Sequence, residues 1–417
     1  MKVEIISIGD ELLIGQTINT NASWMGSRLA QIGANVQFCT VVQDNVIDMT
    51  NAIDTAMNRV DVVLITGGLG PTKDDITKDV LCDYFNAKLV RNEEVLRHVE
   101  LFFALRKRPM LDVNKLQADV PENCEALFNE HGTAPGMWFH KNDKVLVSMP
   151  GVPYEMKSIM SGSVLDRLTN VFDLKSLYYR TIQTQGIGES YIADRMQDLE
   201  DEITANGISL AYLPSPGSVR LRLSSEKSED KIQKIEKYTV RISEQFKQYV
   251  FGYGNDQLQE VVGTLLREKN ATLSTIESCT GGALAALIVS TPGSSSYYQG
   301  SIVSYSNEIK ENIVDVKKNT IINFGVVSEE VVVEMAVNGR QKMGTDYCIS
   351  LSGIAGPDGA VEGKPVGTVW IAISGPKRVI TKKFQFEKNR DRNIRRSVLT
   401  ALNLLRCELM EINIEKS

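Results

Sequence analysis

The sequence predicts an α/β protein in which two domains of alternating strands and helices are joined by a small α+β module. Three observations predict this fold class. Over the first 170 residues, continuous apolar runs alternate with helical patterns, as in a parallel sheet covered on both faces. Residues 177–251 are richer in charge and lose this alternation. It returns from residue 257 onward. We therefore expect domains at 1–170, 171–252 and 255–417.

The first domain is predicted to be a doubly wound, mostly parallel sheet. We expect its strands at 3–8, 36–42, 61–65 and 144–148, and its helices at 22–32, 46–59, 73–85 and 153–168. Ligands of such sheets bind outside the carboxyl ends of the strands. Candidate ligand residues are therefore those that directly follow these strands.

The module and the last domain are predicted from the same patterns. The module is expected to contain strands at 179–184 and 219–223 and a polar helix over 228–248. In the last domain we expect strands at 271–276, 298–305, 346–352, 367–373 and 379–386, and helices at 257–269, 283–289, 306–314, 328–343 and 391–411. Asp256 and Ser328 are predicted helix N-caps, and Gly344 is a predicted helix end.

Composition narrows the partners and the compartment. A net charge of −6 argues against nucleic acid or an anionic membrane as the main partner. The six cysteines form no CxxC pair, and Met1 leads directly into a strand. No apolar run approaches the length of a membrane span, about 18 residues. These features predict a cytoplasmic protein with reduced thiols, no signal peptide and no membrane segment.

The segment IESCTGGALAA, residues 276–286, points most directly to a reaction type. It reads as a strand that turns through two glycines into a helix. Unpaired backbone N–H groups at such a turn point toward the residues before it, here Ser278, Cys279 and Thr280. The layout suits covalent attack on a carbonyl beside an anion-binding hole.

Two nucleophiles remain open on the residues alone. Cys279 carries the better nucleophile, but a cysteine amidase usually relies on a histidine base. The chain has three histidines, and none of them lies within 255–417. A buried cysteine is also often only a small packing residue. Ser278 needs no histidine if Tyr305 or Lys310 serves as its base.

A glycine loop follows the predicted strand 61–65. Its sequence TGGLGPTKDD contains Gly67, Gly68, Gly70, Thr72, Lys73, Asp74 and Asp75. Glycines let backbone N–H groups approach a phosphate closely, and the two carboxylates suit a divalent cation. The spacing is not that of a P-loop. The alternative is a tight turn whose acidic residues stabilise the start of a helix.

A second group of polar residues follows the first strand. Asp10, Asn19 and Asn21 are expected at the same sheet edge as the glycine loop, together with the turns at 132–136 and 150–153. Each of these features alone is typical of a structural turn. Because all of them are expected along one edge, they predict a nucleotide or phosphate site there.

The amino-terminal motifs resemble a known family. IGDELLIGQTINTN, VVQDN, TGGLGPTKDD, GTAPG and PGVP, in this order, resemble the first domain of the competence/damage-inducible protein A (CinA) family. The resemblance implies a fold similar to molybdopterin-binding proteins. It also implies an ADP-ribose pyrophosphatase that uses Mg, Mn or Co. The implied nucleotide-site residues are Asp10, Asn21, Asp44, Gly67, Gly68, Gly70 and Thr72, with Asp74 and Asp75 at the metal.

The carboxyl-terminal motifs resemble the other half of the same family, whose stand-alone form is nicotinamide-nucleotide amidase. They are ESCTGG at 277–282, YSNEIK at 305–310, SGIAGP at 352–357 and Arg390. The resemblance implies that the catalytic residues are Ser278, Tyr305 and Lys310 and that no cofactor is needed. We expect the amides of Gly281 and Gly282 to stabilise the oxyanion. The implied substrate-binding residues are Thr280, Gly281, Gly282, Asn307, Ser352, Gly353 and Arg390.

The expected function is therefore hydrolysis of nicotinamide mononucleotide, with ADP-ribose as the substrate of a second site. The alternative is a nucleotide-binding adaptor linked to competence or DNA repair, with weak or no catalysis. The module resembles the family's KH-like insert, but Gly186-Ile-Gly188 is followed by Glu189 and forms no GxxG clamp. We expect no nucleic-acid or membrane partner, and a homo-oligomer, a dimer.

Overall fold

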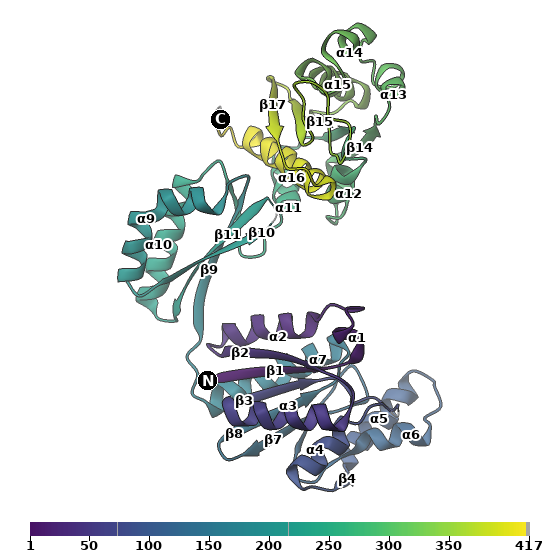
Figure 1. Cartoon of the computed structure of the whole chain (residues 1–417), viewed down its shortest axis with the longest axis vertical. Coiled ribbons are helices and arrows are strands. Elements are labelled where there is room, and N and C mark those ends of the chain that lie inside the picture. The colour runs from purple at the N-terminus through teal and green to yellow at the C-terminus, as the bar shows by residue number, and fades with distance from the viewer. Residues whose placement is uncertain (73, 216, 414–417) are drawn as a thin grey trace. The chain divides into compact units, whose positions relative to one another are not determined.

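The structure is a computed structural model that describes residues 1–72, 74–215 and 217–413. The chain divides into two compact units, which are treated separately below. The first is Met1–Tyr178 with Glu226–Ser228, and the second is Tyr179–Ser225 with Glu229–Ser417. Figure 1 labels the elements of both units along the chain.

The first unit is built on a six-stranded sheet with the order β2-β1-β3-β8-β7-β6. The first four strands are parallel, and β7 and β6 run antiparallel to their neighbours. The strands are β1 (Lys2–Ile8), β2 (Asn35–Val42), β3 (Val62–Thr66), β6 (Glu125–Leu127), β7 (Gly136–Lys141) and β8 (Lys144–Met149). The four strands expected from the sequence are therefore all present.

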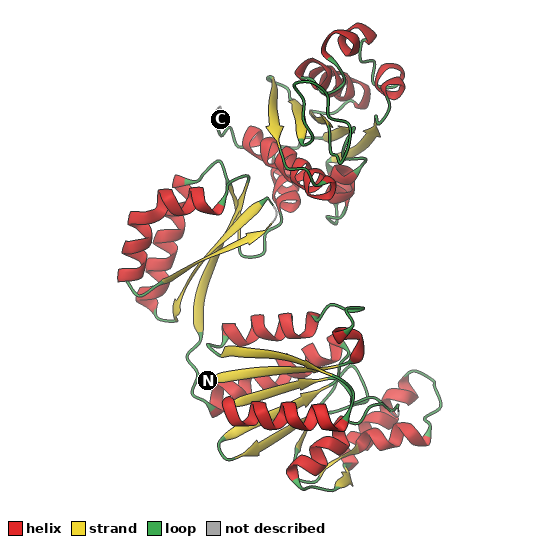
Figure 2. Cartoon of the chain, in the orientation of Figure 1, coloured by secondary structure: helices red, strands yellow, loops and turns green. Residues whose placement is uncertain are grey.

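Helices cover both faces of this sheet (Figure 2). Alternate residues of β1 explain why: Val3 and Ile5 pack into one core, and Ile6 and Ile8 into the other. The first core is closed by α2 (Thr20–Gln31), α7 (Pro153–Ile159) and α8 (Leu165–Val171), and the second by α3 (Val46–Arg59) and α4 (Thr77–Phe85). The predicted doubly wound sheet is confirmed.

The structure differs from the expectation in two places of this unit. The helix expected at 73–85 begins only at Thr77, and the helix expected at 153–168 is interrupted by a π-helical turn, Met160–Val164. Residues 89–127 form several unpredicted elements. They are β4 (Leu89–Arg91), α5 (Glu93–Leu105), α6 (Asp112–Lys115), a 3-10 turn (Leu116–Ala118), β5 (Asp119–Pro121) and β6, and a short α1 (Asp10–Leu13) precedes α2.

The second unit begins with the small α+β module. Its sheet has the order β10-β11-β9-β12, with β9 (Leu177–Gln185), β10 (Ser209–Ser215), β11 (Ser218–Glu226) and β12 (Val250–Tyr253). Figure 1 shows α9 (Glu189–Ala205) and α10 (Glu229–Gln245) side by side on one face of it. The polar helix α10 was expected, whereas α9 was not.

The rest of the second unit is a five-stranded sheet with the order β14-β13-β15-β16-β17. The central strand β13 (Leu273–Glu277) is parallel to β14 (Tyr298–Val303) and β15 (Tyr347–Gly353), while β16 (Thr368–Ser374) and β17 (Val379–Gln385) are antiparallel. The largest core lies under α11 (Leu258–Glu268), α12 (Ala283–Val289) and α16 (Arg390–Leu409), and a second core lies under α15 (Glu329–Met343). Two short helices, α13 (Asn307–Asn312) and α14 (Lys318–Phe324), follow β14.

The helix caps predicted in this domain have different outcomes. Ser328 accepts a hydrogen bond from the Val331 N–H, and Gly344 ends α15 in a left-handed conformation, φ 60°, so both expectations are confirmed. The expectation for Asp256 is wrong. Its carboxylate accepts the Tyr253 N–H, and Gln257 stands at the start of α11.

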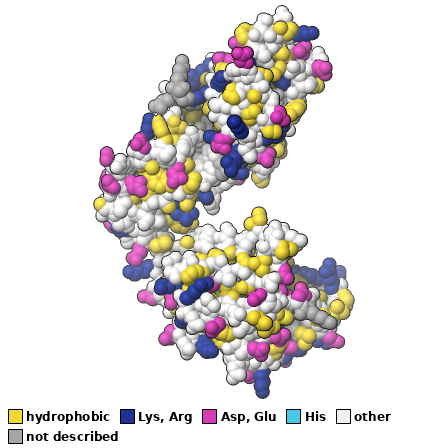
Figure 3. Space-filling model, in the orientation of Figure 1, with side chains coloured by type: hydrophobic (Ala, Val, Ile, Leu, Met, Phe, Trp, Pro, Cys, Tyr) yellow, Lys and Arg dark blue, Asp and Glu magenta, His cyan; other side chains and the backbone are white. Residues whose placement is uncertain are grey.

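The surface view in Figure 3 shows acidic and basic side chains interspersed with small groups of hydrophobic ones. Within the described ranges, no helix combines the length and the apolar character that crossing a membrane requires.

Candidate functional site

The turn that follows the central strand β13 carries Ser278. Its N–H donates to the Leu351 carbonyl of the neighbouring strand β15, 3.0 Å away, which fixes the start of the turn. Gly281 and Gly282 adopt φ values of 60° and 97°, the left-handed region in which glycine is strongly favoured. The chain can therefore reverse within five residues and enter α12 with Ser278 at the carboxyl end of the sheet.

Lys310 of α13 lies directly beside Ser278. Its Nζ is 3.0 Å from Ser278 Oγ, 2.6 Å from the Ser304 carbonyl and 3.5 Å from the Tyr305 carbonyl. The side chain is 2% exposed, and burial lowers the pKa of Lys310 to about 8. A neutral amine has two N–H donors and one lone pair. The two carbonyls match the two donors, which leaves the lone pair for the Ser278 hydroxyl.

Glu277, the last residue of β13, binds the turn through its buried carboxylate. Its carboxylate is fully buried and accepts the N–H groups of Gly282 at 3.1 Å, Leu284 at 3.0 Å and Ala285 at 2.8 Å. It also accepts the Thr280 hydroxyl at 2.7 Å. This carboxylate therefore satisfies the first amides of α12, which otherwise have no partner within the helix.

These contacts overturn the expected oxyanion hole. The Gly282 N–H is bound by Glu277, and the Gly281 N–H donates to the Ser278 carbonyl at 3.1 Å. In the part of the chain that the structure describes, the N–H groups of Cys279 and Thr280 have no carbonyl, carboxylate or hydroxyl acceptor. The amide after a nucleophile is a common oxyanion donor. Cys279 and Thr280 therefore replace the two glycines as candidate donors.

The thiol of Cys279 is a poor candidate nucleophile in this environment. Its side chain packs into the main core of the domain, and burial raises its pKa to about 12. The reactive thiolate is therefore strongly disfavoured near neutral pH. Burial of the Cys279 thiol therefore favours Ser278 as the candidate nucleophile.

Tyr305 and Arg390 meet at the rim of the site. Tyr305 is 63% exposed, and its hydroxyl accepts a hydrogen bond from Arg390 Nη2 at 3.4 Å. Arg390, the first residue of α16, also donates from Nη1 to the Gly356 carbonyl at 2.9 Å. The described residues give the Tyr305 hydroxyl no hydrogen bond to Ser278 or Lys310. The Tyr305 hydroxyl therefore contacts Arg390, the candidate phosphate ligand. Lys310, the candidate base, contacts only the backbone carbonyl of Tyr305.

The other expected substrate contacts differ in how free they are. The Ser352 hydroxyl donates to the Val326 carbonyl at 2.7 Å and is buried. Gly353 packs so closely on β16 that a Cβ there would lie 2.7 Å from Val369. Asn307 begins α13 on the surface, and no described group bonds its side chain. Ser352 and Gly353 are therefore engaged in contacts within the domain. The Asn307 side chain remains a candidate contact for a substrate.

The expected nucleotide residues of the first unit gather at the carboxyl ends of β1, β3 and β8. Gly67 and Gly68 take φ values of 120° and 64°, and a Cβ on Gly67 would lie 2.5 Å from the Ile8 carbonyl. Asn21 donates to the Thr66 hydroxyl at 3.2 Å and to the Gly151 carbonyl at 2.8 Å. Gly67 is buried and its N–H donates to the Met149 carbonyl at 3.1 Å, so it serves the close packing of this edge. The half-buried Gly68 and the exposed Gly70 are the glycines that a ligand could approach.

The acidic residues of this edge have separate roles. Asp75 Oδ2 accepts the Thr72 N–H at 2.9 Å and the Thr72 hydroxyl, which closes the loop around Gly70. Asp44 accepts the Asp10 N–H at 3.3 Å. Burial raises the pKa of Asp44, and the nearby carboxylates of Asp10, Glu11 and Asp74 raise it further. Lys73 lies outside the described residues.

Oxygen donors of this kind suit a hard divalent cation, which would also relieve the repulsion felt by Asp44. Asp44 and Asp74 are the candidate carboxylates to hold it, although Thr72 hydrogen-bonds Asp74 as well as Asp75 and thereby lowers the pKa of Asp74. Among the described residues, no three His, Cys, Asp or Glu side chains are placed as a complete metal-binding group. Substrate phosphates and water would have to supply the remaining ligands, as is usual for Mg²⁺.

Two contributors were not expected from the sequence. They are the Glu277 carboxylate, which binds the amides of the turn, and the Ser304 carbonyl, which accepts a hydrogen bond from Lys310. A signal for Glu277 does exist. An acid that ends an apolar strand directly before a glycine turn must find several donors if it is buried, and a helix start offers them.

Comparison with known proteins covers the whole chain. A family model described as a probable molybdopterin binding domain matches residues 4–170, one described as the damage-inducible protein CinA KH domain matches 179–252, and one described as the CinA C-terminal domain matches 255–409. A CinA-like protein from Cytophaga hutchinsonii is 44% identical over 98% of both chains. A putative competence-damage inducible protein from Caldicellulosiruptor saccharolyticus is 40% identical over 97% of this chain and 98% of its own.

Solved structures match a part of the chain. The crystal structure of CinA from Thermoplasma acidophilum covers 40% of this chain and 96% of its own, at 31% identity and a TM-score of 0.37. A CinA superfamily protein from Klebsiella pneumoniae covers 37% of this chain and 99% of its own, at 31% identity and a TM-score of 0.36. From the full-length identities and the three consecutive family models, the chain belongs to the CinA family.

Proposed function

We propose that the C-terminal domain is an amidohydrolase that converts nicotinamide mononucleotide and water to nicotinate mononucleotide and ammonia. The observation that carries this proposal is the 3.0 Å contact between Lys310 Nζ and Ser278 Oγ in a domain without histidine. Burial lowers the pKa of Lys310 to about 8, so an appreciable fraction of the amine is neutral near neutral pH. No cofactor enters this chemistry.

In the acylation half-reaction, neutral Lys310 takes the Ser278 proton while Oγ attacks the carboxamide carbon. Collapse of the tetrahedral intermediate breaks the C–N bond, and Lys310 returns the proton to the leaving ammonia. The product is a nicotinoyl ester on Ser278. Water, deprotonated by Lys310, then hydrolyses this ester, releases the carboxylate and restores the hydroxyl.

Backbone amides stabilise the negative charge that develops on the carbonyl oxygen. The free N–H groups of Cys279 and Thr280 are suited to this role, and one such donor contributes about 10²–10³ in rate. Glu277 keeps the other amides of the turn occupied. The Arg390 guanidinium is the natural ligand of the substrate phosphate, and the Tyr305 hydroxyl holds it at the rim.

The decisive experiment compares two adjacent substitutions in the full-length protein. We expect Ser278→Ala to abolish ammonia release from nicotinamide mononucleotide, because the nucleophile is lost. Cys279→Ala, the matched control one residue away, is expected to retain activity within a few-fold. The opposite pattern, with activity kept in Ser278→Ala and lost in Cys279→Ala, would show that the assignment of the nucleophile is wrong.

We also propose that the first unit hydrolyses ADP-ribose to AMP and ribose 5-phosphate. The supporting observation is the glycine edge around Gly67 with the mutually repelling carboxylates Asp10, Asp44 and Asp74 beside it. A divalent cation bound there supplies charge neutralisation for a pyrophosphate. Gly68 and Gly70 let the backbone approach the phosphates, and Asn21 fixes the edge. Undiminished turnover in the Asp74→Ala/Asp75→Ala protein after treatment with chelator would show that neither these carboxylates nor a divalent cation carries the reaction.

The alternative is a nucleotide-responsive adaptor, as the competence-damage names of the relatives suggest. Such a protein would bind nucleotides and release no ammonia, so the same assay separates the two functions. For the proposed enzyme we also expect a cytoplasmic location and a homodimer. We expect no nucleic-acid or membrane partner. Light scattering on the purified full-length chain measures the dimer directly.

A further inference from the structure

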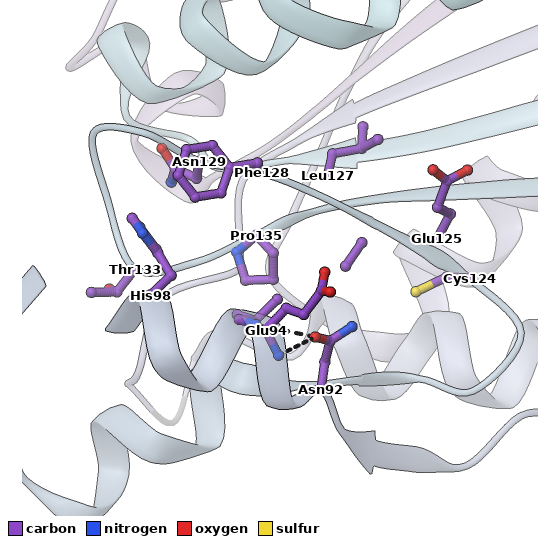
Figure 4. Close-up of a pocket in the computed structure, with 12 residues that line it drawn as sticks. Asn92, Glu94, His98, Cys124, Glu125, Leu127, Phe128, Asn129, Thr133 and Pro135 are labelled. Atoms are coloured by element: carbon purple, nitrogen blue, oxygen red, sulfur yellow. Dashed lines mark hydrogen bonds between the residues drawn. The ribbon is translucent and has the colours of Figure 1, made fainter. Parts of the chain in front are cut away.

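The helix α5 lies on the surface of the first unit and is fixed by its inner side. Val99 on this side is fully buried. The His98 ring meets the Phe128 ring edge-on at a centroid distance of 4.6 Å, and both rings line a cavity of about 350 Å³ (Figure 4). His98 Nε2 also lies 3.0 Å from the Gly132 carbonyl. The inner side of α5 therefore faces the turn between β6 and β7 and is held there by these contacts.

The outer side of α5 exposes large apolar side chains. Leu101 is 56% exposed and Leu105 is 73% exposed, and residues four apart share one face of a helix. Successive helical residues are about 100° apart, so Leu101 points roughly opposite to the buried Val99. The elements that follow, α6 and the 3-10 turn, pack against α5 and carry further exposed apolar side chains: Leu111, Val113 and Leu116. Such a concentration of apolar side chains in water marks an interaction surface.

Charge is polarised along α5. Its first turn carries Glu93 and Glu94, and Lys107 and Arg108 follow its last turn. The Arg108 N–H donates to the Phe103 carbonyl at 3.1 Å, which keeps Arg108 at the end of the helix. Among the described residues, no group binds the Glu94 carboxylate or the Arg108 guanidinium. One end of the exposed face is therefore acidic and the other basic, with the leucines between them.

A face of this kind complements a second copy of itself. Two α5 helices related by a two-fold axis can run antiparallel, so that the acidic start of each helix meets the basic end of the other. The opposed helix dipoles favour the same arrangement. Leu101 is seven residues from Glu94 and seven from Arg108, so an axis at Leu101 brings Glu94 of one copy to Arg108 of the other. A partner of uniform charge would instead meet like charges at one of the two ends.

We propose that the outer face of α5, together with the exposed side of α6 and the 3-10 turn, is the contact through which two copies of this chain form a dimer. Leu101 packs against Leu101 of the other copy, and Leu105 packs against the aliphatic stem of Arg97. The homodimer expected from the sequence thereby acquires a defined surface and symmetry. The contact is independent of both proposed activities.

Sedimentation of the full-length protein over a range of concentrations tests the apolar part of this contact. We expect Leu101→Asp/Leu105→Asp to raise the dissociation constant of the dimer at least about hundredfold, because each lost leucine counts twice in a two-fold contact. Ile47→Asp is the matched control, since Ile47 is 72% exposed on α3, another helix of the same unit. It should dimerise as the wild type does. Far-UV circular dichroism checks that the variants are folded.

Reversal of charge tests the antiparallel pairing. Glu94→Lys and Arg108→Glu should each raise the dissociation constant about tenfold, since each places like charges together at both ends of the contact. The double variant Glu94→Lys/Arg108→Glu restores opposite charges across the axis and is expected to dimerise within about threefold of the wild type. A monomeric wild type, which would leave this face to a partner of another kind, overturns the proposal. So does an unchanged dimer in Leu101→Asp/Leu105→Asp, or a double charge variant that binds no more tightly than the single ones.

Discussion

The Glu277 carboxylate accepts the N–H of Ala285 at 2.8 Å, so that one buried side chain joins the end of β13 to the first turn of α12. The same carboxylate also takes the amides of Gly282 and Leu284. A ligand anion cannot use these amides while Glu277 occupies them. The helix start therefore stabilises a protein carboxylate, and in the proposed amidase only the amides of the turn beside Ser278 are left to bind charge on the substrate.

We expect Glu277→Gln to lower kcat for the proposed amidase by about 10²-fold with little change in KM. The amide nitrogen of Gln cannot accept the N–H groups that Glu277 binds, so the turn and its free amides shift. The free energy of unfolding should fall by about 1–3 kcal/mol. Steady-state kinetics and urea unfolding measure both. Glu308→Gln, an exposed acid on α13, is the control, and a kcat within threefold of the wild type in Glu277→Gln would refute the positioning role.

The pH dependence should report Lys310. Burial lowers its pKa to about 8, so the neutral base becomes the major form only above that pH. We expect kcat/KM to rise about tenfold per pH unit between pH 6 and 7 and to level off above about 8. Lys310→Met, which keeps the length without the amine, should be inactive at every pH yet folded. A profile that is flat from pH 6 to 9 would exclude Lys310 as the base.

The sequence could predict that Ser278 and Lys310 lie close together, because chain order and sheet register bring them to one edge. Glu277 pairs with Val303 in the parallel register of β13 and β14, so the residues that follow, Ser278 and Ser304, lie at the same edge. The Ser304 N–H donates to the Glu277 carbonyl at 2.8 Å. Lys310, six residues later on α13, then reaches back to Ser278. A resemblance in spacing could therefore find the pair.

What the sequence could not predict depends on the paths of side chains. The direction of the Glu277 carboxylate decides which amides of the turn stay free. No sequence pattern indicates that direction. The Tyr305 hydroxyl finds Arg390, 85 residues away, because α16 begins beside α13 only in the folded domain. The helix α5 was missed although Asn92 caps it, with its side chain accepting the N–H groups of Glu94 and Val95. An asparagine followed by two glutamates and an apolar run is a helix start that can be recognised in the sequence.

Arg390→Ala should separate recognition of the phosphate from the chemistry. We expect the KM for nicotinamide mononucleotide to rise at least about tenfold, since a charge-assisted contact is lost. Turnover of nicotinamide riboside, which has no phosphate, should change less than threefold. Arg392→Ala, two residues along the same helix and paired to Glu387, is the control. Equal losses with both substrates would contradict a phosphate-binding role and indicate that Arg390 instead supports the loop at Gly356.

Asp44→Asn should raise the thermal stability of the first unit while it removes the proposed metal-dependent activity. Burial raises the pKa of Asp44, and the carboxylates of Asp10, Glu11 and Asp74 raise it further, so its ionised form is disfavoured in the fold. Asparagine keeps an acceptor for the Asp10 N–H and carries no charge. The melting temperature at pH 7 and low salt is therefore expected to rise, and ADP-ribose hydrolysis with Mg²⁺ to fall.

The sign of the pH effect distinguishes this cause from a general gain in packing. A carboxyl whose pKa is raised by folding destabilises the protein where it is ionised, and the penalty disappears as the pH falls through that pKa. The stability difference between Asp44→Asn and the wild type should therefore shrink from pH 7 toward pH 4, and also when salt is added at pH 7. Asp166→Asn, an exposed acid on α8, controls for the loss of one charge. A gain in stability that does not depend on pH or salt would mean that repulsion among these carboxylates does not destabilise the first unit. The electrostatic argument for a bound cation would then fail.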